Sequence, residues 1–124
     1  MWEHWDSVNE NGEFWHTKMN SFNHYTYGAV CDWLFGDAAG IKIADDGAGY
    51  KKITLTPIPD ARLGRLSYSI DTREGRISSS WRYTDERTVR YEFDLPSGTV
   101  AEMTLAGGTS AILCGGSYVF TERY

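Results

Sequence analysis

The chain contains 124 residues, a length that fits one domain or a small domain with part of a second one. Its net charge of −5 at pH 7, without a basic patch, excludes nucleic acid as an expected partner, and no apolar run is long enough to predict a membrane partner. Hydrophobic residues make up 41% of the chain without low-complexity tracts, so a packed core is expected instead of disorder.

Residues 1–21 show no clear periodicity and are predicted to form a loop rich in Trp, Glu and Asn, with a turn at Asn11-Gly12. Over Phe22–Ala39, apolar residues recur at steps of three and four, which predicts a helix. Ser21 is a suitable N-cap and Gly40 a suitable helix stop. Apolar residues cover nearly the whole circumference of this helix. It is therefore expected to pack on the rest of the chain, to frame an aromatic patch or to be buried in a homo-oligomer.

The segment Asp45–Gly49 is typical of a linker, and beyond it the period of apolar residues changes to two. Short strands separated by turn signals predict a mainly β fold, an antiparallel β-sandwich. The predicted domains are residues 1–44, which hold the loop and the helix, and residues 45–124, which hold the sandwich. The predicted strands are Lys51–Pro57, Gly64–Thr72, Arg76–Thr84, Thr88–Leu95, Val100–Ala106, Ser110–Cys114 and Tyr118–Arg123.

Two ionisable residues near the N-terminus, Glu3 and His24, lie among aromatic and amide side chains. This is the chemistry of a sugar-binding site, because aromatic faces stack on C–H surfaces while carboxylate, amide and imidazole groups bond hydroxyls. A carboxylate flanked by Trp2 and Trp5 is suited to act as a general base. The alternatives are a solvated surface glutamate and a hydrogen-bonded packing histidine.

Other kinds of site are not predicted. His4, His16, His24 and Cys31 lack the spacing of zinc ligands, so no metal is expected. No Gly-rich phosphate loop, Gly-x-Ser-x-Gly or Cys-x-x-Cys motif occurs, so no cofactor is expected. The two cysteines, Cys31 and Cys114, are predicted to be free and buried.

Aromatic residues of the β half allow two interpretations. They can form a sugar-binding platform on the sandwich, or they can be core residues and cross-strand pairs, which is the more common role at alternate strand positions. The residues concerned are Tyr68, Trp81, Tyr83, Tyr91 and Tyr118.

The motifs at residues 1–7 and 19–29 together resemble the end of the catalytic domain of bacterial α-L-rhamnosidases, glycoside hydrolase family 78. The resemblance continues more loosely through the β half, and His4 stands where Arg is common in the first motif. It implies that residues 1–44 are the last loop and helix of an (α/α)₆ catalytic barrel and that residues 45–124 are the sandwich that follows it.

The resemblance also implies roles for single residues. Glu3 matches the general base of an inverting hydrolysis of terminal α-L-rhamnosides, His24 matches a rhamnose contact, and Trp5 helps to form the pocket. The partners are rhamnose-containing glycosides or polysaccharides. The general acid would lie upstream of residue 1, so the chain alone is expected to be inactive. The alternative is an autonomous carbohydrate-binding or structural β-sandwich module.

Overall fold

The computed structural model describes residues 2–123, apart from the side chain of Tyr27. It divides into two compact units, Met1–Trp33 and Leu34–Tyr124. The predicted division into domains 1–44 and 45–124 stays a prediction.

In the first unit, residues 2–24 form an irregular loop that contains a short turn. Val8 and Phe14 form an isolated antiparallel bridge. The carboxamide oxygen of Asn9 accepts hydrogen bonds from the amides of Asn11 and Glu13 at 3.0 and 2.9 Å. Gly12 has a φ of +79°, a left-handed conformation that glycine adopts without strain. The turn predicted at Asn11-Gly12 is therefore confirmed.

Helical structure begins later than predicted. A 3₁₀ turn (η1, Tyr25–Gly28) leads into α1 (Ala29–Trp33), and a π-helical segment (η2, Leu34–Ala38) continues it in the second unit. The prediction of Ser21 as N-cap is wrong, because the residue before the first helical turn is His24. None of the α1 residues is buried within the chain, so the expectations of an aromatic patch and of burial in a homo-oligomer stay predictions. Within residues 2–123, no helix has the length and apolar character needed to cross a membrane.

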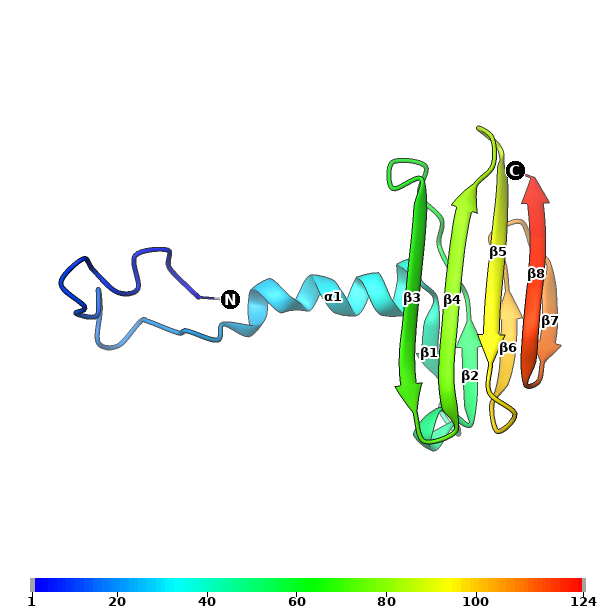
Figure 1. The fold of residues 1–124 in the computed structure, drawn as a ribbon, viewed down its shortest axis with the longest axis horizontal. Coiled ribbons are helices and arrows are strands. Elements are labelled where there is room, and N and C mark those ends of the chain that lie inside the picture. The colour runs from blue at the N-terminus through cyan, green and yellow to red at the C-terminus, as the bar shows by residue number, and fades with distance from the viewer. Residues whose placement is uncertain (1, 124) are drawn as a thin grey trace. The chain divides into compact units, whose positions relative to one another are not determined.

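The second unit is a sandwich of two four-stranded sheets, which Figure 1 shows as stacked layers. One sheet has the order β1-β2-β6-β7 and the other β3-β4-β5-β8. All strand pairs are antiparallel except β2 with β6, which is parallel. The strands are β1 (Ile41–Ile43), β2 (Lys52–Leu55), β3 (Arg65–Thr72), β4 (Gly75–Tyr83), β5 (Thr88–Leu95), β6 (Val100–Thr104), β7 (Ser110–Leu113) and β8 (Gly116–Arg123), with a 3₁₀ turn, η3 (Ala48–Tyr50), before β2.

The β-sandwich is confirmed, and every predicted strand is present. The sequence did not predict β1, which pairs with β2 from Ile41 to Ile43. The alternation predicted in Thr88–Leu95 is also confirmed. Its apolar residues belong to the core together with residues of β2, β4 and β6. The buried members of β5 are Val89, Tyr91, Phe93 and Leu95.

The core also decides between the two interpretations of the aromatic residues. Trp81 is 2% exposed and Tyr91 is 0% exposed, so neither can stack on a ligand at the surface. Tyr68, Tyr83 and Tyr118 are partly buried and pack against the same core. The core interpretation is therefore confirmed. The prediction for the two cysteines is confirmed in one part and wrong in the other. Cys31 and Cys114 are free, as predicted, but they are exposed instead of buried.

Side chains of β4 fix the end of the helical segment to the sandwich. The last carbonyl groups of a helix have no partner within it. Here Trp81 Nε1 donates to the Ala38 carbonyl at 2.7 Å, and Ser79 Oγ donates to the Ala39 carbonyl at 2.6 Å. Gly40 then turns the chain with a φ of +78°, and a Cβ at this position would lie 2.2 Å from the Pro57 nitrogen. Gly40 is thus the helix stop that the sequence predicts, and η2 is part of the sandwich unit.

Candidate functional site

The two N-terminal motifs meet in the first unit. The Glu3 amide donates to the Ser21 carbonyl at 2.7 Å, and the Ser21 amide donates to Glu3 Oε2 at 3.0 Å. Beside this pair, the rings of Trp2 and Phe22 make an edge contact with centroids 5.1 Å apart. The segment that contains the predicted base is therefore held against the segment that contains His24.

A buried serine forms hydrogen bonds that join three parts of the loop that carries Glu3. Ser7 is 0% exposed, and its hydroxyl donates to the His4 carbonyl at 2.7 Å. The Ser7 carbonyl accepts from the Trp15 amide at 3.1 Å and from Asn20 Nδ2 at 2.8 Å. Ser7 and Asn20 were not predicted as site residues, because their role depends on contacts across the loop. Their polar character within a Trp-rich loop was the available signal.

The other predicted site residues lie in different surroundings. His24 is half-buried directly before η1, where its Nε2 lies 3.1 Å from the Thr26 hydroxyl. Its ring is 5.9 Å from that of Tyr25 between centroids. Trp5 is 98% exposed, so its indole is open to solvent. Within residues 2–123, no group of three or more His, Cys, Asp or Glu side chains is arranged to hold a metal ion.

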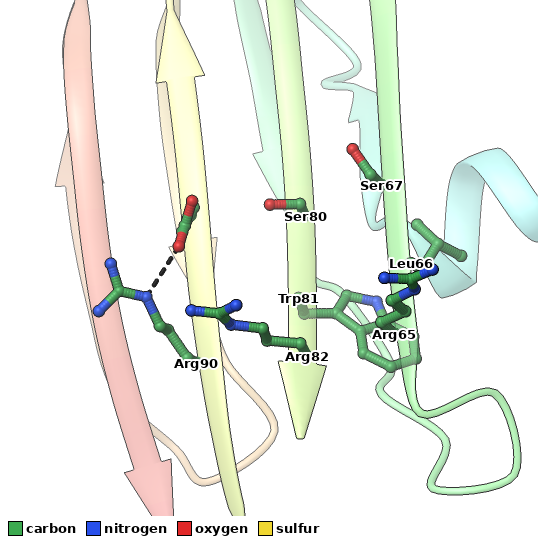
Figure 2. A pocket seen from close by; sticks show the side chains of 8 residues that line it. Arg65, Leu66, Ser67, Ser80, Trp81, Arg82 and Arg90 are labelled. Atoms are coloured by element: carbon green, nitrogen blue, oxygen red, sulfur yellow. Dashed lines mark hydrogen bonds and ion pairs between the residues drawn. The ribbon is translucent and has the colours of Figure 1, made fainter. Parts of the chain in front are cut away.

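The outer face of the β3-β4-β5-β8 sheet carries a second polar constellation, which the sequence analysis missed. A depression of about 500 Å³ lies over β3, β4 and β5. Figure 2 shows Arg65, Arg82 and Arg90 in one row across these strands, with Ser67 and Ser80 in the next row. The three arginines lie on three different strands, each at a polar position of an alternating pattern. The row becomes visible only once the register of the strands is known.

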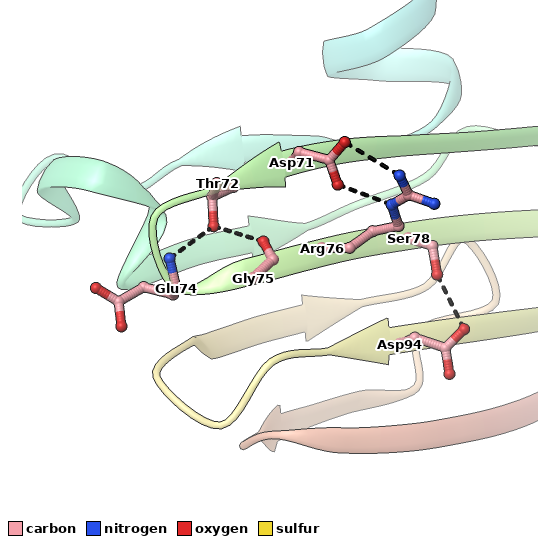
Figure 3. Close-up of polar contacts among 7 residues, drawn as sticks. All are labelled: Asp71, Thr72, Glu74, Gly75, Arg76, Ser78 and Asp94. Atoms are coloured by element: carbon pink, nitrogen blue, oxygen red, sulfur yellow. Dashed lines mark hydrogen bonds and ion pairs between the residues drawn. The ribbon is translucent and has the colours of Figure 1, made fainter.

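Further along the same face, Asp94 accepts hydrogen bonds from two serine hydroxyls. Ser117 Oγ donates to Oδ1 at 2.5 Å, and Ser78 Oγ donates to Oδ2 at 2.9 Å. Figure 3 shows the Ser78 bond beside the paired side chains of Asp71 and Arg76. Because the two hydroxyls stabilise the ionised carboxylate, they hold the pKa of Asp94 below its ordinary value of 3.8.

This arrangement predicts a pH effect. The pKa of Asp94 is lower in the folded state than in the unfolded chain. The ionised carboxylate therefore stabilises the fold at pH values above the ordinary pKa of 3.8, and this stabilisation is lost as the pH falls through the lowered pKa. Replacing Ser117 with alanine is expected to raise the pKa of Asp94, as measured by NMR titration of the carboxyl carbon. Ser97→Ala, in the exposed turn after β5, is the control and leaves the titration unchanged. Equal titration midpoints for Asp94 in both variants would contradict the assignment.

Comparison with known proteins covers both parts of the chain. Residues 40–118 match the family described as bacterial alpha-L-rhamnosidase C-terminal domain. Residues 1–37 match the family described as bacterial alpha-L-rhamnosidase 6 hairpin glycosidase domain. The two matches together include Glu3, Trp5 and His24 in one segment and the whole of β1–β7 in the other.

Individual relatives carry the same name. An alpha-L-rhamnosidase of Formosa agariphila is 39% identical over 113 residues, which are 91% of this chain and 12% of that protein. One of Streptomyces avermitilis is 35% identical over 103 residues, 83% of this chain and 10% of that protein. The chain thus spans only about a tenth of the length of these relatives.

Solved structures agree with the sequence relatives. The native rhamnosidase of Aspergillus terreus superposes with a TM-score of 0.81 at 29% identity, over 99% of this chain and 14% of that one. The Streptomyces avermitilis alpha-L-rhamnosidase complexed with L-rhamnose gives a TM-score of 0.73 at 30% identity, again over 99% and 14%. Since the C-terminal domain family matches more than half of its residues, the chain belongs to the bacterial alpha-L-rhamnosidase family.

Proposed function

We propose that this chain is the carboxyl-terminal part of an inverting α-L-rhamnosidase that hydrolyses terminal α-L-rhamnosides. The contact between the two N-terminal motifs carries the proposal, because it holds the Glu3 carboxylate against the segment that contains His24. The names of the relatives support the reaction, and the L-rhamnose bound to the Streptomyces avermitilis protein supports the sugar.

Glu3 is the general base of the proposed reaction. Its carboxylate removes a proton from a water molecule while the water oxygen attacks the anomeric carbon, and the bond to the leaving oxygen breaks on the opposite face of the sugar. The hydrogen bond from the Ser21 amide to Oε2 favours one orientation of the carboxylate. A fixed orientation helps the base, because the reacting atoms must be aligned before the proton moves.

His24 and Trp5 bind rhamnose in this proposal. The imidazole of His24 bonds a sugar hydroxyl, and the exposed indole of Trp5 offers a face to the C–H surface of the sugar. His4 Nε2 and Asn20 Oδ1 are buried and have no hydrogen-bond partner among the described residues, and neither atom is exposed to a ligand in this conformation.

The proposed reaction also needs a general acid. Inverting glycosidases need a second carboxyl group about 6.5–9.5 Å from the first, which protonates the leaving oxygen. Glu10 and Glu13 are exposed in the loop, and Glu13 bonds the Asn9 side chain. As the family resemblance implies, the acid is expected in another part of the enzyme.

The isolated chain is accordingly expected to have no rhamnosidase activity. It is incubated with 4-nitrophenyl α-L-rhamnoside, and release of 4-nitrophenol is followed by absorbance. Turnover above that of buffer would contradict the expectation that the chain lacks the general acid. In the positive arm, the chain replaces the matching stretch of the Streptomyces avermitilis relative, and this chimera is expected to hydrolyse the substrate. A chimera that unfolds cooperatively on heating but remains inactive would count against the proposed function.

A further inference from the structure

Three arginines on the outer face of the sandwich are cross-strand neighbours of one another. The register places Arg65 of β3 opposite Arg82 of β4, and Arg82 opposite Arg90 of β5. Like charges directly opposite one another on a sheet destabilise it, because their Cβ atoms are only about 5 Å apart. A sheet that keeps such a row gains stability from an anion that neutralises it.

The protein itself neutralises only one end of this row. Arg90 Nε lies 2.7 Å from Glu92 Oε1. Arg65 and Arg82 form no ion pair within residues 2–123. Elsewhere on the same sheet, Arg76 is bound by both carboxylate oxygens of Asp71, at 2.8 and 3.1 Å. The guanidinium groups of Arg65 and Arg82 are therefore free to bind an anion from solution.

The surroundings of the row select the kind of anion. A guanidinium group binds a carboxylate through two parallel hydrogen bonds. Glu92 also lines the depression, and its negative charge opposes a doubly charged group such as phosphate more than a singly charged carboxylate. The hydroxyls of Ser67 and Ser80 lie one row away, where they can bond hydroxyl groups of the same ligand.

We propose that Arg65 and Arg82 bind the carboxylate of an acidic saccharide, with Ser67 and Ser80 as contacts to its hydroxyl groups. The saccharide class rests on the proposed function, because a rhamnosidase acts on glycosides. The site lies on the sandwich unit, whereas Glu3 and His24 belong to the first unit. It serves to bind an acidic sugar unit.

The test is an NMR titration of the ¹⁵N-labelled chain with sodium glucuronate, with glucose, acetate and inorganic sulfate as comparison probes. Glucuronate is expected to shift the amide signals of β3, β4 and β5 in a saturable way. Acetate, which lacks the hydroxyls, binds more weakly, and neutral glucose causes no saturable shift. The affinity for glucuronate decreases with added sodium chloride, since the contacts are exposed charges.

Three double variants distinguish a specific role of Arg65 and Arg82 from an effect of the net charge of the chain. R65Q/R82Q is expected to lose about tenfold or more in affinity for glucuronate, the loss that follows from removing charge-assisted hydrogen bonds. R73Q/R87Q changes the net charge equally in exposed turns and is expected to stay within about twofold of the wild type. R65K/R82K keeps the charge without the planar fork, and it loses affinity to an intermediate degree.

Four results would overturn the proposal. They are no saturable shift with glucuronate, equal binding of glucose, tighter binding of sulfate than of glucuronate, and an equal loss of affinity in the control variant R73Q/R87Q. Since hydrolysis by the chimera tests the proposed function separately, a negative titration with an active chimera removes only the saccharide site. An inactive chimera with a positive titration removes only the rhamnosidase proposal.

Discussion

Replacing Trp81 with phenylalanine is expected to lower the free energy of unfolding by about 1–3 kcal/mol. The substitution keeps an aromatic ring in the core but removes the Nε1–H group that donates to the Ala38 carbonyl at 2.7 Å. Ala38 is 0% exposed, so the carbonyl would be left without a partner and without access to water. An unsatisfied buried acceptor has a cost of this size.

Replacing Trp81 with alanine is expected to have a larger effect, about 3–5 kcal/mol, because it also leaves a cavity between the sheets. Tyr83→Phe is the matched control. Tyr83 is a half-buried neighbour whose ring lies 6.4 Å from that of Trp81, and its change is expected to stay within about 0.5 kcal/mol. Urea unfolding followed by circular dichroism measures all three variants. A phenylalanine variant as stable as the wild type would show that the indole hydrogen bond does not anchor the helix end.

Replacing Glu3 with glutamine in the active chimera is expected to reduce kcat by about 10²–10⁴, the usual contribution of a general base. The amide oxygen of glutamine can still accept the hydrogen bond from Ser21, so the loop is expected to keep its shape. KM should change little, because the sugar contacts proposed for His24 and Trp5 remain. Steady-state kinetics with 4-nitrophenyl α-L-rhamnoside measures both constants.

Two further measurements distinguish a base from a structural residue. Glu10→Gln makes the same chemical change at an exposed position of the same loop, and its kcat should lie within about twofold of that of the unaltered chimera. Glu3→Ala should recover activity when azide is added, since azide attacks without first losing a proton. A Glu3→Gln chimera with unchanged kcat would rule out Glu3 as the base.

The fold was predictable where its signal is local. The strand Thr88–Leu95 has the same bounds in the sequence analysis and in the structure, because each alternate residue reports which face is buried. The helix start was misplaced because Phe22 continues the apolar periodicity. In the structure, Phe22 packs against the rings of Trp2 and Phe14 instead. β1 was missed because three residues are too short to establish a period.

The site was predictable only in part, for a related reason. The resemblance singled out Glu3 and His24 as residues of two motifs, but the hydrogen bonds between Glu3 and Ser21 join distant positions and follow no local rule. The arginine row depends on the register of β3, β4 and β5. A shift of one residue in either pairing would separate the three side chains, and composition alone cannot determine that register.

The parallel pairing of β2 with β6 has a consequence for synthesis of the protein. β2 ends at Leu55 and β6 begins at Val100, so the whole β3-β4-β5 meander is made between the two partners. As the chain leaves the ribosome, β3, β4 and β5 can pair one after another. One edge of β2 has no partner until residues 100–104 emerge. During that interval Ile53 and Leu55 lie on an open strand edge, the kind of surface that chaperones protect from mispairing.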